Sequence, residues 1–267
     1  MDTSWLNYTG EALLLTLLLG WGGLPLLRHY KARQSIREEG PKSHRAKRTD
    51  AARWGALPAA GSRSLPAVEP LADSPGALAA FHYARTWTAG FLDDFIKAEL
   101  HRNLGLTARQ KMTGQILLAV LFCYGISATL HMPFTIAVPF STAEISIGWF
   151  YYPFVVLVIV GASNAVNLTD GLDGLAAGCS VIAFGAYFLY SYMKGMNDIA
   201  AFSLIMAGCC MGFLFFNYHP AKVFMGDTGS LALGGAIAGI SVLTKTELLL
   251  VFLGMILSLK PCQSFSR

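Results

Sequence analysis

Long apolar segments separated by short polar ones run through most of this 267-residue sequence. They approach the roughly 20 residues that a helix needs to cross a hydrocarbon core of about 30 Å. A bilayer offers no water to the backbone and these segments lack strand-like alternation, so we expect helices. The windows are 12–27, 114–131, 146–163, 174–192, 198–216, 229–244 and 247–259. The sequence therefore predicts an all-α, polytopic transmembrane bundle that forms one domain over residues 1–267.

Composition supports this interpretation, because 54% of the residues are hydrophobic and only 13% are charged. A soluble domain of this size would be far more polar. Many basic residues gather in the loop 28–48, which is typical of a cytoplasmic anchor for anionic groups and not of a nucleic-acid site. Asp2 and Glu11 precede the first apolar window, which favours a retained span over a cleaved signal.

Positive charge also predicts the topology. Loop 28–48 and segment 95–111 are both basic and belong on the cytoplasmic side. Successive crossings then place 164–173 and 217–228 on the same side. Residues 49–90 are atypical, since they contain no good span, and we interpret them as a flexible Pro/Ala-rich linker. The polar loops are thus expected to meet at one membrane face.

Two of these polar segments carry carboxylates in unusual patterns. Asp93 and Asp94 are adjacent, and neighbouring carboxylates repel unless a cation lies near them. The alternative is that one of them caps a helix while the other is solvated. The second segment has polar side chains at every third position, which share one face of a helix-like turn: Asn164, Asn167, Asp170 and Asp173.

The third segment places Asp227 between Gly226 and Thr228 at the expected start of a helix. Free N–H groups there favour anions, and a carboxylate can hold a metal against a phosphate. Simple helix capping is the alternative. Acidic side chains, amides and basic flanks together favour Mg²⁺ and a pyrophosphate over zinc, which points to phosphoryl-type transfer.

The three segments resemble those of the polyprenyl-phosphate phospho-sugar transferase superfamily, especially its phospho-N-acetylmuramoyl-pentapeptide transferase branch. The resemblance covers most of 28–48 and 90–258. It implies transfer of phospho-MurNAc-pentapeptide from UDP-MurNAc-pentapeptide to undecaprenyl phosphate, giving lipid I and UMP with Mg²⁺. This step belongs to peptidoglycan synthesis at the cytoplasmic face of the bacterial inner membrane. The same resemblance suggests a homodimer.

The resemblance also implies roles for individual residues. Asp93 and Asp94 match paired aspartates, one of which would activate the lipid phosphate. Asp227 matches a Mg²⁺-binding aspartate, and Asn167 is a second expected metal position. A one-step displacement and a covalent aspartyl intermediate both stay open. The positions expected to bind substrate are Asn164, Asn167, Asp170, Asp173, Asn217, Lys47 and Lys97.

Two stretches depart from the family pattern. After Arg48 the family continues with Thr-Pro-Thr-Met-Gly-Gly and two spans, and after Ser258 with the last of about ten spans and a His-rich motif. Back-translation of Leu259–Arg267 in another frame reads Glu-Ala-Leu-Ser-Val-Ile-Leu-Gln, which resembles the family there. We therefore interpret the family spans as missing after about residue 258 through a frame shift, with a less clear shift in 49–90, and expect weak or absent activity.

Three other functions remain as alternatives. A phospho-GlcNAc-type transferase to polyprenyl phosphate would use similar loops, and a catalytically inactive membrane remnant would explain the atypical segment 49–90. A transporter or channel is disfavoured, because its ionisable groups should lie inside the spans and here they cluster in end loops.

Overall fold

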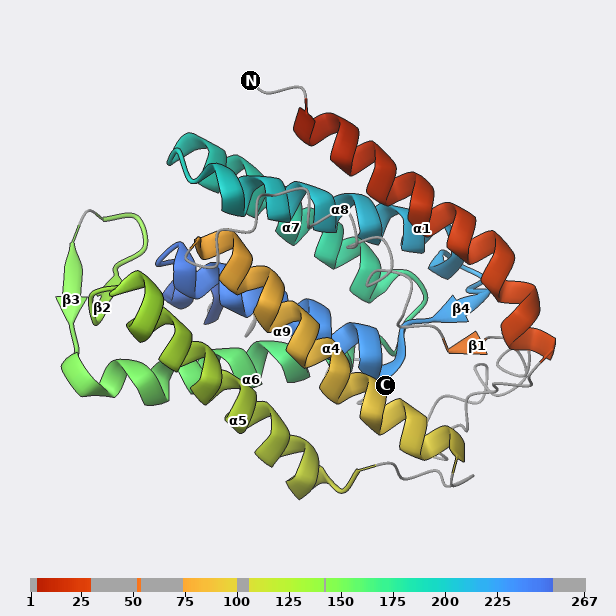
Figure 1. Cartoon of the computed structure of the whole chain (residues 1–267), viewed down its shortest axis with the longest axis horizontal. Helices are drawn as coiled ribbons and strands as arrows, with labels where there is room; N and C mark the ends of the chain where they lie inside the picture. Colours follow the sequence, from red (N-terminus) through yellow and green to blue (C-terminus); the bar gives the residue numbers. More distant parts are fainter. Residues whose placement is uncertain (1–3, 30–51, 54–73, 100–105, 142, 252–267) are drawn as a thin grey trace, which may run out of the picture.

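The chain forms a bundle of helices, as the apolar windows predict (Figure 1). The computed structural model describes residues 4–29, 52–53, 74–99, 106–141 and 143–251. Its long helices in these ranges are α1 (Ser4–His29), α4 (Pro75–Glu99), α5 (Ala108–Gly125), α6 (Tyr151–Thr169), α7 (Leu175–Met193), α8 (Asn197–Asn217) and α9 (Gly226–Leu243). The predicted all-α class is confirmed.

Five helical segments are long and apolar enough to cross a membrane: Ala108–Leu130, Gly148–Thr169, Leu175–Met193, Asn197–Asn217 and Gly226–Leu243. They coincide with five of the predicted windows, which confirms a polytopic membrane protein. The window 12–27 lies within α1, a helix that is not among these five. The window 247–259 is helical over 247–251, and its remainder lies outside the described residues.

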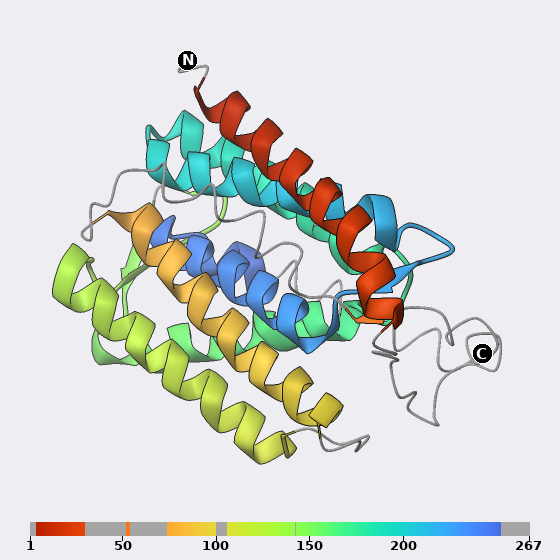
Figure 2. The same cartoon turned by 45° about the vertical axis from the view of Figure 1, so that its right-hand side comes forward.

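Helix α9 is the central helix of the bundle, and α4 and α6 pack along it (Figure 2). Every residue of α9 from Thr228 to Leu243 is buried. Two glycines permit this packing: a Cβ on Gly234 would lie 2.5 Å from Ser163 Cα, and one on Gly90 would lie 2.4 Å from the Asp227 carbonyl oxygen. Such close backbone contacts are typical of helices that pack in lipid. They hold the N-terminus of α9 against α4.

A second group of helices lies beside this centre, with α1 packed along α8 and α8 along α7 (Figure 1). Short irregular elements join the helices. Strands β1 (Ala52–Arg53) and β4 (Val223–Phe224) pair in parallel, whereas β2 (Thr135–Ala137) and β3 (Glu144–Ser146) form an antiparallel hairpin. A π-helical turn, Ile126–Leu130, extends α5, and a 3₁₀ turn, Gly148–Phe150, precedes α6.

The two strand pairs mark opposite ends of the bundle (Figure 1). We call the end with β1 and β4 the site end, because the loops after α6 and α8 and the C-terminal end of α4 gather there. The end with the hairpin β2–β3 is called the far end. The expectation that the polar loops meet at one end is therefore met for 164–173, 217–228 and the region of Asp93.

The linker interpretation of residues 49–90 is wrong for 75–90, which belong to α4. Pro75 starts the helix, a position that suits its missing N–H, and the Ser74 hydroxyl accepts a hydrogen bond from Ala77 N–H at 3.1 Å. The buried residues of α4 recur at helical spacing, but several of them are polar and lower the mean hydropathy of the segment. They include Ala79, His82, Tyr83, Thr86, Gly90 and Asp93. Residues 49–51 and 54–73 lie outside the described part of the chain.

Candidate functional site

The three predicted catalytic aspartates lie together at the site end. Asp93 and Asp94 are in the last two turns of α4, and Asp227 is in the first turn of α9. One carboxylate oxygen from each lies within 4.8 Å of the others. The residues come from segments more than 130 positions apart, and the packing of Gly90 against the start of α9 brings them together. We call these three residues the acidic cluster.

Lys97 neutralises part of this negative charge. It lies one helical turn beyond the paired aspartates, so its ammonium can reach back to both. Its Nζ is 2.5 Å from Asp93 Oδ2 and 3.6 Å from Asp94 Oδ1, and it also forms an ion pair with Asp227. Burial lowers the pKa of Lys97, but the Asp227 carboxylate and its neighbours outweigh that effect and raise the pKa overall. Lys97 therefore stays charged within the acidic cluster.

A second lysine was not predicted as a site residue. Lys111 Nζ lies 3.1 Å from Asp227 Oδ2. It is in the first turn of α5, whose start is set by a capping box between Thr107 and Gln110. In the sequence, Lys111 indicates only the membrane topology. The capping box was a usable clue, since it places this side chain at the end of a helix that faces the aspartates.

The paired aspartates have different surroundings. Asp94 Oδ2 accepts hydrogen bonds from the Thr228 N–H at 2.8 Å and the Thr228 hydroxyl at 2.7 Å, so Asp94 caps α9 from another helix. Asp93 is 2% exposed, and its Oδ1 accepts the Leu106 N–H at 2.7 Å. Burial is the main cause that raises the pKa of Asp93. Asp94 therefore caps a helix, as the alternative interpretation predicted. Asp93 is buried, whereas that interpretation predicted a solvated side chain.

Asn167 lies directly beside Asp227. Its amide nitrogen donates to Asp227 Oδ1 at 2.5 Å and to the Ser230 hydroxyl at 2.7 Å. Ser230 in turn donates to the Gly226 carbonyl at 2.7 Å. These bonds hold the Asp227 carboxylate in place at the helix start. A metal-binding role for Asn167 stays a prediction, although its position next to Asp227 is compatible with one.

The other polar positions of the 164–173 segment face different partners. Asp170 Oδ2 accepts the Gly226 N–H at 2.9 Å, and burial raises the pKa of Asp170 to about 8. Asp173 Oδ2 lies 2.8 Å from His219 Nδ1. Asn164 donates to Gln115 on α5 at 2.9 Å. The four polar side chains therefore do not share one set of partners. Asn167 and Asp170 contact the start of α9, whereas Asn164 and Asp173 contact residues beside it.

Asn217 connects the loops that surround the cluster. It is 1% exposed, accepts the Gly174 N–H at 3.0 Å and donates to the Val223 carbonyl at 2.8 Å. It therefore holds the loop after α6 to the loop after α8. Lys47, the remaining predicted substrate-binding residue, lies outside the described residues.

The acidic cluster suits a hard divalent cation. Its three possible donors are all carboxylate oxygens, which is the chemistry that Mg²⁺ prefers. Two lysines border the same oxygens and can neutralise or contact phosphate. The described residues at the site end thus provide both a cation site and positive charge for an anionic substrate.

Membrane-crossing helices that carry such a cluster at one end define the class of protein, a polytopic membrane protein with a candidate cation site. Residues 77–245 match the family described as Glycosyl transferase family 4. Three similar relatives are all named phospho-N-acetylmuramoyl-pentapeptide-transferase. Those of Geobacillus kaustophilus, Bacillus pumilus and Bacillus velezensis are 47%, 46% and 45% identical, each over 90% of this chain and 75% of the relative. The chain belongs to the phospho-N-acetylmuramoyl-pentapeptide transferase family, which confirms the resemblance of its loops.

Proposed function

We propose that the site end transfers phospho-MurNAc-pentapeptide from UDP-MurNAc-pentapeptide to undecaprenyl phosphate, forming lipid I and UMP in peptidoglycan synthesis. The observation that carries the proposal is the convergence of Asp93, Asp94 and Asp227 with Lys97 and Lys111 at one end of the spans. The names of the relatives support the substrate, since each contains the phospho-N-acetylmuramoyl-pentapeptide group.

The proposed reaction exchanges one phosphoanhydride for another. An oxygen of undecaprenyl phosphate attacks the sugar-bearing phosphorus of the UDP-sugar, and the bond from that phosphorus to the bridging oxygen breaks. UMP leaves with the bonding electrons. Negative charge accumulates on the phosphate oxygens throughout, so catalysis depends on positioning and on neutralising that charge. A cluster that holds lysines next to a cation site meets both needs.

Each described residue has a proposed part in this chemistry. Asp93, Asp94 and Asp227 would hold Mg²⁺, which when bound would neutralise pyrophosphate oxygens and polarise the reacting phosphorus. Lys97 and Lys111, which both pair with Asp227 Oδ2, would contact phosphate beside it. Asp94 also positions the start of α9 through Thr228. Asn167 would support Asp227, and the residues that orient the nucleotide and sugar would be Asn164, Asp170, Asp173 and Asn217.

The proposal includes an orientation in the membrane. The site end would face the cytoplasm of a bacterial inner membrane, because UDP-sugars are made there and the basic segments of the sequence favour that side. The lipid carrier would approach from the bilayer. The homodimer suggested by the resemblance stays a prediction.

The test is Mg²⁺-dependent release of UMP by the full chain in lipid nanodiscs, with UDP-MurNAc-pentapeptide and undecaprenyl phosphate. Asp227→Ala removes a central carboxylate and is expected to abolish release. The matched control is Glu144→Gln, which changes an exposed carboxylate on the far-end hairpin and should leave release unchanged. A parallel reaction with UDP-GlcNAc tests the alternative sugar.

Each outcome separates the candidate functions. Mg²⁺-dependent release that only Asp227→Ala abolishes supports the proposal. Release that Asp227→Ala leaves intact would overturn the assignment of the cluster. Release with UDP-GlcNAc alone would establish the alternative transferase, and no release from any protein would favour the catalytically inactive remnant.

A further inference from the structure

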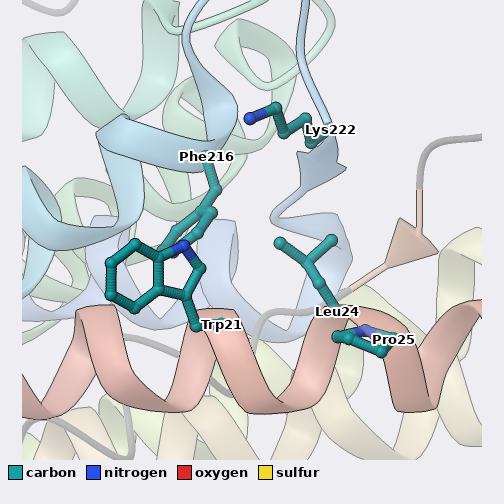
Figure 3. Close-up of a pocket in the computed structure, with 5 residues that line it drawn as sticks. All are labelled: Trp21, Leu24, Pro25, Phe216 and Lys222. Atoms are coloured by element: carbon teal, nitrogen blue, oxygen red, sulfur yellow. The ribbon is translucent and has the colours of Figure 1, made fainter.

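A cavity separate from the acidic cluster lies between α1 and α8 (Figure 3). It has a volume of about 240 Å³ and is lined by Trp21, Leu24, Pro25, Phe216 and Lys222. Four of these five side chains are apolar, and the fifth carries a positive charge. None of the five belongs to the cluster of Asp93, Asp94 and Asp227. The cavity is therefore a distinct feature of the site end.

The side chains are arranged with an apolar floor and a cationic rim. Trp21 and Leu24 rise from α1 toward Phe216, and Lys222 reaches over the same opening from the loop before β4 (Figure 3). Phe216 is buried, while Trp21 is 68% exposed. The cavity thus opens beside the indole ring of Trp21. Any occupant must be apolar where it contacts Trp21 and Phe216 and must carry a negative charge near the Lys222 ammonium.

Within the described part of the chain, Lys222 has no carboxylate partner and can bind an anion. Its side chain is exposed, and among the residues for which the structure gives ion pairs no carboxylate lies within 4.0 Å of its ammonium. Its backbone is fixed, because its N–H donates to the Phe216 carbonyl at 2.9 Å. A cation held at a defined place above an apolar cavity is complementary to a molecule with an anionic head and a hydrocarbon chain.

The position and size of the cavity restrict the ligand. Tryptophan and lysine are typical of the level where a bilayer meets water, and basic pockets between membrane helices bind anionic lipid headgroups. Clefts that enclose drug-sized molecules occupy roughly 300–1,000 Å³, so this cavity of about 240 Å³ accommodates a segment of a chain and not a nucleotide. Both considerations favour a lipid.

We propose that this cavity binds an anionic phospholipid of the bilayer. One acyl chain lies against Trp21, Leu24 and Phe216, and the phosphate contacts the Lys222 ammonium. Phosphatidylglycerol has both features. The inference does not rest on the proposed transfer reaction, since it concerns a surface outside the acidic cluster.

The test uses the quenching of tryptophan fluorescence by brominated lipid. The full chain is reconstituted into phosphatidylcholine vesicles that contain increasing mole fractions of phosphatidylglycerol brominated on its acyl chains, or of brominated phosphatidylcholine. Subtracting the signal of Trp21→Phe isolates Trp21 from the other four tryptophans. We expect brominated phosphatidylglycerol to half-quench Trp21 at a mole fraction about fivefold lower than brominated phosphatidylcholine does. This ratio corresponds to about 1 kcal/mol for one basic residue that contacts an anionic lipid.

Substitutions of lysine identify the contact. Lys222→Gln is expected to abolish the preference and Lys222→Arg to keep it, while the matched control Lys194→Gln, an exposed lysine at the far end, keeps it as well. Equal quenching by the two brominated lipids, or a preference that survives Lys222→Gln, overturns the proposal. Recovery of Trp21 fluorescence on adding less than one equivalent of undecaprenyl phosphate also overturns it, because the occupant would then be the carrier lipid.

Discussion

Both ends of the bundle contain a buried carboxylate near a lysine, but the two ends use these charges differently. At the far end, Glu247 is fully buried and accepts the Tyr151 hydroxyl at 2.7 Å. Lys245 donates to the carbonyls of Pro133 and Thr135 at 2.7 and 3.1 Å and to the Tyr151 hydroxyl at 3.0 Å. At the far end, Glu247 and Lys245 are thus joined through the hydroxyl of Tyr151 and not by direct contact.

At the site end the charged groups contact one another directly. The three aspartates of the acidic cluster share Lys97, and Asp227 also pairs with Lys111. Burying several carboxylates together is unfavourable unless cations compensate, so this arrangement depends on what binds there. At the far end Lys245 therefore holds the hairpin, whereas the charges at the site end are available to a ligand.

The largest expected difference comes from removing one carboxylate at each end. Asp94→Ala removes a carboxylate of the acidic cluster and the cap of α9, and should lower UMP release by about 100-fold or more. Glu247→Gln keeps an acceptor for Tyr151 and should leave release within about twofold of the wild type. Binding of Mn²⁺ to each protein gives a second readout. Equal losses from both substitutions would show that release depends as much on the far-end carboxylate as on the acidic cluster.

The next largest difference comes from removing one lysine at each end. Lys111→Met should lower UMP release by about 10-fold to 100-fold, because charge-assisted contacts contribute roughly 1.5–3 kcal/mol. Lys245→Met should leave release unchanged but lower the melting temperature by several degrees, since the hairpin loses its contacts to Lys245. A stable Lys245→Met protein with reduced release would contradict a purely structural role for the far end.

Much of this arrangement is predictable from sequence, and the residues show why. Five spans are recognisable because hydropathy alone determines them. The convergence of Asp93, Asp94 and Asp227 is predictable as well, because topology brings their segments to one face and the loop motifs mark them. Their exact contacts are not, since the cap from Asp94 to Thr228 depends on how closely α4 approaches α9 at Gly90.

The missed features have a common physical cause. Helix α4 buries His82 and Thr86 against other helices, so hydropathy understates its place in the bundle. Lys111 and Gln115 lie on one face of α5, but only tertiary packing reveals that Asp227 and Asn164 are opposite them. Sequence patterns report which side of a helix is polar. They do not report which polar partner another helix supplies.

A smaller effect is expected from the connection between the two loops at the site end. Asn217→Ala removes a buried donor and acceptor and leaves the Gly174 N–H and Val223 carbonyl without this partner. It should destabilise the protein by about 2 kcal/mol, seen as a fall of several degrees in melting temperature. Thr135→Ala on the far-end hairpin removes one exposed hydroxyl contact to Glu144 and should change the melting temperature less. A neutral Asn217→Ala would show that the loops are held by other contacts.

The last effect concerns the pH dependence of stability at the site end. Because burial raises the pKa of Asp170 from 3.8 to about 8, the folded protein holds a proton that the unfolded chain releases between these values. The contribution of Asp170 to stability is therefore full below about pH 4, falls as pH rises toward 8 and is level above it. Asp170→Asn should flatten this part of the melting-temperature profile measured from pH 5 to 8, while Glu144→Gln at the far end should not. Identical profiles for wild type and Asp170→Asn would show that Asp170 is ionised in the folded protein, which would place one more negative charge beside the acidic cluster.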